Sequence, residues 1–188
     1  ETETARLLPP TAVKLGVAFE CQTSAEGIET AVPVTIEYGV ARRVELLVEP
    51  VVHTLIRPNH GPGASGIGDL EGTLLYLVRR ESAGGPGLAL AGEIKLPTAR
   101  NRLIGTGATD FTGYLIGSKR LGRLDLHVNA SYAVLGGPPG TDLANVWASA
   151  LALEYHLAPR LELFVESLAN TGAASDAEGG AEPTATSP

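Results

Sequence analysis

An alternation of apolar and polar residues runs along almost the whole chain, and it constrains the fold more than any other feature. In residues 13–22, apolar side chains occupy every odd position from Val13 to Cys21, whereas Lys14 and Glu20 occupy even positions. Side chains two residues apart share one face of a β-strand, because successive Cβ atoms point to opposite sides. This segment is therefore predicted to be a strand with one apolar and one polar face.

The same period recurs in further segments that turn residues separate, and a helical period is almost absent. We expect strands at 13–22, 32–40, 44–57, 69–79, 88–96, 110–120, 124–134, 146–157 and 161–167. In 44–57 the expected apolar face includes Val52 and Ile56, whereas 110–120 alternates poorly and its two faces stay unassigned. About nine short strands without helices predict an all-β fold.

The connections between these segments alternate in length. Tight links lie at 39–43, 120–123 and 158–160, with a medium one at 80–87, and longer ones lie at 23–29, 57–68, 98–109 and 136–142. In an antiparallel meander this order places the long loops at one end of the sheet and most tight turns at the other. Outer-membrane β-barrels have this layout, so an antiparallel transmembrane β-barrel is the predicted architecture.

Alternation alone leaves open which face meets water, because a soluble lipocalin-like barrel encloses its apolar face and a membrane barrel turns it to lipid. Charged residues in mid-strand, and aromatic residues such as Trp147 and Tyr155 near strand ends, favour the membrane barrel. The polar face would then line the interior, with acids outnumbering bases. The expected lumen-facing residues are Lys14, Glu20, Glu37, Glu45, Glu49, His53, Asp69, Glu71, Glu93, Lys95, Asp125, His127, Glu154, His156, Glu162 and Glu166.

Several other functions lack sequence support. The net charge of −7 argues against a nucleic-acid partner, which requires a basic face. Gly61, Gly63 and Gly66 match the letters of a dinucleotide-binding turn, but the next segment has a strand period and provides no helix N-terminus. The histidines lack local metal-ligand spacing, Cys21 is the single cysteine, and no Gly-x-Ser-x-Gly elbow occurs. We therefore expect no enzymatic activity, no cofactor and no metal.

Short motifs in the middle half of the chain resemble a known family. They are Gly68-Asp69-Leu70, Leu96-Pro97-Thr98, Gly105-Thr106-Gly107 followed by Asp110-Phe111, and Ser118-Lys119-Arg120. With them the chain resembles the outer-membrane transporter family linked to the meta pathway of phenol degradation. The resemblance implies a bacterial outer-membrane β-barrel, and it carries over no catalytic residue and little about the solute. Members of that family end in a strand with a terminal aromatic residue, whereas this sequence ends in "ASDAEGGAEPTATSP".

The two ends of the sequence suggest how the chain is processed and completed. We expect residues 1–172 to form the barrel domain and 173–188 to form a flexible outer loop or tail. The start "ETETARLLPP" without Met suggests a cleaved signal peptide. Single-chain bacterial barrels have even strand numbers, so about nine strands predict either further strands or closure by another chain.

The sequence thus predicts an outer-membrane, transporter-like or channel-like barrel with a polar, acidic lumen for small solutes. Its expected partners are outer-membrane lipid, small solutes and another chain that completes the barrel. Two alternatives remain open: a soluble β-barrel or sandwich that binds an apolar ligand, and a structural component of an envelope assembly.

Overall fold

The computed structural model describes residues 3–137, 144–158 and 161–171, and it gives these residues a single antiparallel sheet. These residues contain no helix that is long and apolar enough to cross a membrane. The predicted tail at 173–188 lies outside the described residues. The strands are β1 (Val13–Val17), β2 (Glu20–Thr23), β3 (Gly27–Ala41), β4 (Val44–Pro58), β5 (Ala64–Gly66), β6 (Leu70–Arg79), β7 (Gly87–Leu96), β8 (Asp110–Leu121), β9 (Leu124–Val134), β10 (Val146–Ala158) and β11 (Leu161–Asn170).

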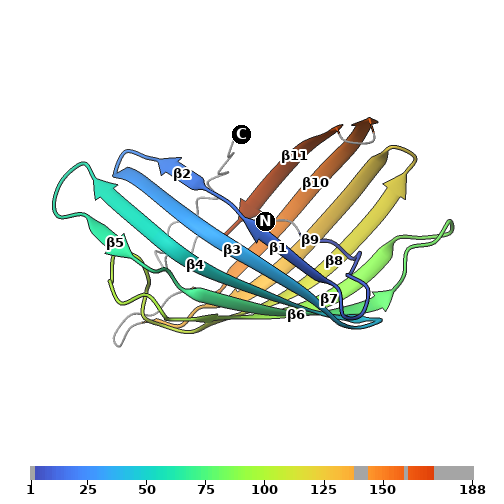
Figure 1. Cartoon of the computed structure of the whole chain (residues 1–188), viewed down its shortest axis with the longest axis horizontal. Helices are drawn as coiled ribbons and strands as arrows, with labels where there is room; N and C mark the ends of the chain where they lie inside the picture. The colour runs from blue at the N-terminus through green and yellow to red at the C-terminus, as the bar shows by residue number, and fades with distance from the viewer. Residues whose placement is uncertain (1–2, 138–143, 159–160, 172–188) are drawn as a thin grey trace.

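Neighbours in the sheet follow chain order, as a meander requires. The path is β1-β3-β4-β6-β7-β8-β9-β10-β11, while β2 pairs with β3 and β5 pairs with β4. Figure 1 shows one curved layer that bends from β1 and β3 through β6 and β7 and returns toward β10 and β11. The all-β antiparallel meander is confirmed, and it forms a half-barrel of nine strands. In the part of the chain that the structure describes, no strand pairing joins β1 to β11.

The predicted first strand is divided into β1 and β2 by the sequence of its neighbour. Both pieces pair with β3 in one continuous register, from Val13 opposite Tyr38 to Thr23 opposite Ile28. The interruption lies beside Pro33, which has no N–H to donate, although its carbonyl accepts from the Ala18 N–H at 3.1 Å. One proline on the inner strand thus explains the break.

A bulge in β4 changes the alternation that the sequence predicts there. Val32 and Pro33 of β3 are consecutive, but their partners on β4 are His53 and Val51. The extra residue, Val52, shifts every later side chain of β4 to the opposite face. Ile56, which was expected on the apolar face, consequently shares the face of the buried Thr54, and His53 lies opposite Val32.

The two faces of the half-barrel differ sharply in chemistry. Large apolar side chains are exposed on the convex face, including Leu15, Leu74, Val128, Leu151 and Phe111. Polar side chains are buried on the concave face: Glu45, Thr73, Ser118, Asp125, His127 and Asn129 are all less than 9% exposed. The register of β8 with β9 also assigns the faces of β8, since Ser118 pairs with His127 and Ile116 pairs with Asn129.

A segment at the N-terminus, residues 3–8, lies over the middle of the concave face, and we call it the N-terminal strap. Its Ala5 is 4% exposed and joins an apolar core cluster that contains Leu75 and Ile116 of the sheet. Leu47, Leu77 and Ala89 complete the buried cluster, and Leu7 of the strap packs against it. The apolar core of the molecule therefore lies between the strap and the sheet, an arrangement that the alternation did not predict.

Candidate functional site

The strap is held on the concave face by backbone hydrogen bonds to polar side chains of the sheet. The N–H of Ala5 donates to Ser118 Oγ at 2.8 Å, and the N–H of Leu8 donates to Glu45 Oε2 at 2.5 Å. The Asn129 amide faces the backbone of Glu3 and can donate to its carbonyl oxygen at 3.0 Å. Buried backbone groups require such partners, so the polar residues of the concave face satisfy the strap.

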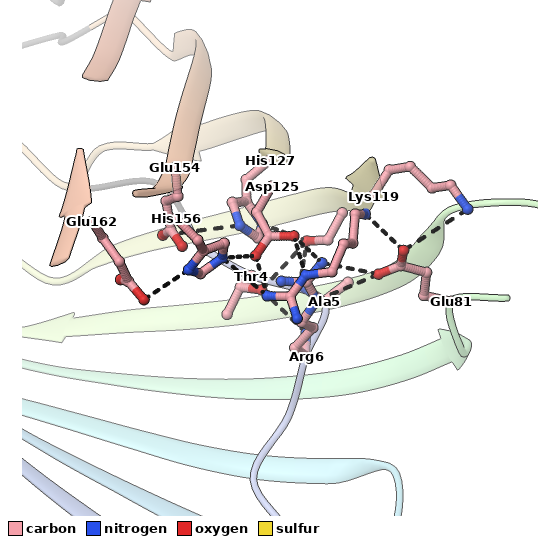
Figure 2. Close-up of polar contacts among 12 residues, drawn as sticks. Thr4, Ala5, Arg6, Glu81, Lys119, Asp125, His127, Glu154, His156 and Glu162 are labelled. Atoms are coloured by element: carbon pink, nitrogen blue, oxygen red, sulfur yellow. Dashed lines mark hydrogen bonds and ion pairs between the residues drawn. The ribbon is translucent and has the colours of Figure 1, made fainter. Parts of the chain in front are cut away.

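Asp125 of β9 is the centre of the most connected polar cluster. Arg6 Nη2 lies 2.7 Å from Asp125 Oδ1, Arg120 Nε donates to the same oxygen at 2.8 Å, and His156 Nε2 lies 2.8 Å from Oδ2. Figure 2 shows Arg6 reaching from the strap toward Asp125, with His156 on the other side of the carboxylate. Asp125 is fully buried, so its charge requires this set of donors.

Strand register explains why these groups meet. Arg120 of β8 and Glu154 of β10 are the cross-strand partners of Asp125, and directly paired residues share one face of a sheet. His156 lies two residues beyond Glu154 on the same face of β10, and its Nδ1 is 2.9 Å from Glu162 Oε1 of β11. Four adjacent strands thus contribute to one polar row near the tight turns.

Glu81, in the connection between β6 and β7, supplies a second carboxylate for Arg6. Arg6 Nη2 donates to Glu81 Oε2 at 3.0 Å, while Glu81 Oε1 accepts from the backbone N–H of Arg120 at 2.6 Å. That N–H and then Arg6 hold the pKa of Glu81 below its usual range. The side-chain hydrogen bond to Asp125, reinforced by Glu81, raises the pKa of Arg6, so its guanidinium stays charged.

Ser118, His127 and Glu154 have the residue types of a hydrolase triad, but their geometry fits a structural role. Ser118 Oγ and His127 Nδ1 are 2.8 Å apart, while His127 Nε2 lies 4.0 Å from Glu154 Oε1. Ser118 is 1% exposed and accepts the N–H of Ala5, so its oxygen faces the strap. Ser118 therefore supports the strap, and His127 in turn contacts Ser118.

Asp125, Glu154 and His156 also place potential metal ligands within 4.8 Å of one another. Arg6 and Arg120 both bind the Asp125 carboxylate, and their positive charges oppose a cation at that oxygen. The cluster therefore provides a poor metal site and a good site for a guanidinium group.

Beside the strap, the concave face contains acidic cavities. One of about 470 Å³ is lined by five carboxylates, Glu3, Glu20, Glu49, Glu71 and Glu93, together with Tyr114, and no Lys or Arg is among the described residues that line it. The hydroxyl of Tyr114 donates to Glu93 Oε2 at 2.9 Å. A second cavity of about 230 Å³ shares Glu3 and Glu49 with the first and adds Lys14, Glu37, Glu45, His127 and Glu154.

Of the remaining residues expected in the lumen, Lys95 and Glu166 share the concave face by strand register, whereas His53 does not. Asp69 accepts the N–H of Ala99 in a long loop at 3.0 Å, and Lys95 forms an ion pair with Asp110. Glu166 of β11 lies opposite Ala152. His53 is exposed beside Ser65 of β5, because the bulge in β4 turns it away from the face of Glu45 and Glu49.

Sequence reasoning missed several residues of the Asp125 cluster. Ser118 and Arg120 lie in the segment whose faces the alternation left unassigned, although pairing of 110–120 with 124–134 across the tight turn would have placed them. Arg6 and Glu81 lie outside the strands, and nothing in the alternation indicates that they come together.

Neither comparison with known proteins finds a relative: no protein-family model matches the chain, and no curated protein matches it significantly. The class of protein is therefore defined by the fold and the concave site, as an antiparallel half-barrel whose own N-terminal segment covers the centre of its polar face.

Proposed function

We propose that the chain forms the wall of a bacterial outer-membrane β-barrel, transporter-like or channel-like, with its convex face in lipid. The inverted distribution of side chains carries this proposal. Leu15 is 71% exposed and Trp147 61% exposed, whereas Asp125 on the other face is 0% exposed. A protein surrounded by water buries its large apolar side chains, and a membrane barrel exposes them to lipid.

The concave face suggests the class of solute. Carboxylates outnumber basic residues around both cavities beside the strap, and the described lining of the larger one contains no Lys or Arg. An acidic, low-dielectric channel attracts cations and repels anions. Small cationic or neutral polar solutes are therefore the proposed cargo.

The alternatives fit the same arrangement less well. A soluble barrel for an apolar ligand needs an apolar cavity, whereas each of the two concave cavities is lined by five carboxylates. A purely structural envelope component gives no role to an acidic interior. In a bilayer the edges β1 and β11 require partners, since unpaired backbone groups in lipid cost several kcal/mol each. We propose that further strands or another chain supply them.

Labelling of single cysteines tests the orientation of the faces. In a Cys21→Ser background, which removes the exposed native thiol, cysteines at Val128 and Leu151 represent the convex face. Cysteines at Thr35 and Ser131 represent the concave face. In native membranes a water-soluble maleimide should label 35 and 131 and leave 128 and 151 unmodified until the protein is denatured. Rapid labelling of 128 and 151 in native membranes would reject the membrane orientation.

Reversal potentials in planar bilayers test the solute class separately. At low salt the channel should prefer cations, and this preference should weaken as the screening length falls from about 10 Å at 0.1 M salt to about 3 Å at 1 M. Replacing Glu49, Glu71 and Glu93 together by Gln should reduce the preference, while Glu29→Gln, outside both cavities, serves as the control. Anion preference in the unmodified protein would contradict the proposal.

A further inference from the structure

We propose that Asp125 and Glu81 form a guanidinium-binding subsite on the concave face, and that Arg6 of the strap fills it as an internal stand-in for a cationic solute. The inference rests on the proposed function for its physiological meaning, because it places the subsite on the solute path. Its physical basis is independent of conduction, since the structure already places a guanidinium group in the site.

The contacts of Arg6 define the subsite. Nη2 lies between the two carboxylates, 2.7 Å from Asp125 Oδ1 and 3.0 Å from Glu81 Oε2, and Nε is 3.4 Å from the same Glu81 oxygen. A guanidinium is a planar fork of donors that can bridge separate acceptors, whereas an ammonium is a compact point charge. In Figure 2 the Arg6 side chain lies between Asp125 of β9 and Glu81 of the β6–β7 connection.

The charge balance around the subsite favours a cation when Arg6 is absent. Four carboxylates belong to the Asp125 cluster or contact the histidines beside it. Arg120 and Lys119 are the basic residues of the sheet that contact these carboxylates. The carboxylates are Glu81, Asp125, Glu154 and Glu162. With the histidines neutral, the site without Arg6 has excess negative charge, and Asp125 is too buried for water to compensate it fully.

Solutes can reach this position from the end of the sheet that bears the tight turns. A wide cavity of about 410 Å³ opens beside Arg6 and is lined by Arg6, Glu81, Ser82, Ala83, Lys119 and Arg120. The Arg6 side chain is 32% exposed, so a solute in this cavity can approach it and the carboxylates that it binds. A guanidinium solute entering there would compete with Arg6 for the two carboxylates. Displacement of Arg6 would remove these contacts and weaken the binding of the strap to the sheet.

Binding to the purified protein in detergent tests the subsite directly, with ethylguanidine as probe and propylamine as the ammonium control of similar length. By isothermal titration calorimetry, Arg6→Ala protein should bind ethylguanidine, and unmodified protein should bind it roughly tenfold more weakly because Arg6 competes. Propylamine should bind Arg6→Ala protein more weakly than ethylguanidine does. Adding Glu81→Gln to Arg6→Ala should reduce the affinity for ethylguanidine, while Asp125 remains to hold Arg120.

The possible results separate the subsite from the proposed channel. Equal binding of ethylguanidine by unmodified and Arg6→Ala proteins, or equal affinity for the two probes, would overturn the inference. If Arg6→Ala does not fold, as judged by its circular dichroism spectrum, Arg6→Gln takes its place and must show the same gain. Guanidinium binding without conduction would reject only the channel, whereas cation conduction without guanidinium binding would reject only the subsite.

Discussion

The centre of the sheet and its last strand have the same alternation but very different burial. In β8, Ile116 and Ser118 are 0% and 1% exposed, whereas nearly every residue of β11 is exposed on both faces. The difference follows the strap, which covers the centre through Ala5 and makes contacts with β8 and β9. The sheet alone therefore does not bury its concave face, and the N-terminal segment completes the core.

The centre of the sheet and β11 also differ in the surroundings of their charged side chains. At the centre, Asp125 is surrounded by donors from the strap and from adjacent strands. On β11, Glu162 is 56% exposed through its side chain and pairs with His156. The strap thus creates both an apolar core and a cluster of mutually stabilising charges.

The largest effect is expected from shortening an apolar side chain beneath the strap. Ile116→Ala should lower the free energy of unfolding by about 2–5 kcal/mol, because it leaves a cavity between β8 and the strap. Leu163→Ala on β11, where the side chain is 57% exposed, should cost clearly less. Urea unfolding of both variants in detergent measures the two losses, and equal losses would contradict the strap-covered core.

The next effect concerns the convex face and depends on depth in a bilayer. Leu151→Arg, near the middle of β10, should cost about 2–4 kcal/mol in lipid vesicles, and Leu121→Arg, at the tight turn that ends β8, should cost about 0–1 kcal/mol. Both side chains are exposed in the structure, so in water the two variants should be alike. Folding equilibria in vesicles provide the measurement, and equal stabilities there would argue against a membrane-spanning sheet.

A third effect concerns the close approach of the backbone at Pro9, directly after the strap, to Gly39 of β3. A Cβ at Gly39 of β3 would lie 2.1 Å from the carbonyl oxygen of Pro9, so Gly39→Ala should force the backbone after the strap away from β3. We expect a loss of about 1–3 kcal/mol in the free energy of unfolding, which is typical of overpacking. Gly92→Ala on β7 is the matched control, because no other described residue beyond its two chain neighbours has a heavy atom within 4 Å of its Cβ position. Similar losses in both variants would show that the close approach to Pro9 is not what matters.

The strands were predictable from the sequence, whereas the strap and its cluster were not. Period-two alternation depends on local side-chain order, so it placed segments such as 124–134 at the observed bounds of β9. Alternation failed at Val52, because a bulge arises from pairing with another strand and leaves no local pattern. It also failed to predict the burial of Ala5, since the strap has no period and its contact with Ser118 spans 113 positions of sequence.

The residues of the candidate site likewise fall into those that the sequence predicted and those that it did not. Asp125, His127, Glu154 and His156 were expected on one polar face, and the register brings them together. Their partners Arg6 and Glu81 come from segments outside the strands, and only the three-dimensional path of the chain brings those residues to Asp125. Sequence periodicity can thus identify the strand residues that line such a site, but not a residue such as Arg6 that reaches it from outside the strands.

The smallest effect is a dependence of strap docking on pH through Glu81. The pKa of Glu81 in the folded protein lies below its usual value, because the Arg120 N–H and Arg6 stabilise its charged form. A lowered pKa contributes stability that is present above the usual value of about 4.3 and is lost as pH falls through the lower, folded value. Arg6 stays charged at these pH values, so protonation of Glu81 removes only the charged acceptor of its hydrogen bond.

A spin label at position 4 in a Cys21→Ser, Thr4→Cys protein would report this change without a pH-dependent labelling step. We expect its mobility to increase modestly as pH falls from about 6 to about 3, since Glu81 then takes up a proton that the docked strap disfavours. In Glu81→Gln the label should already be more mobile at pH 6, and its mobility should change less with pH because position 81 no longer takes up a proton. The Asp125 contact of Arg6 persists in that variant, so the strap should remain docked on average. An unchanged pH response in Glu81→Gln would show that Glu81 does not hold the strap and would leave Asp125 as the contact on which Arg6 depends.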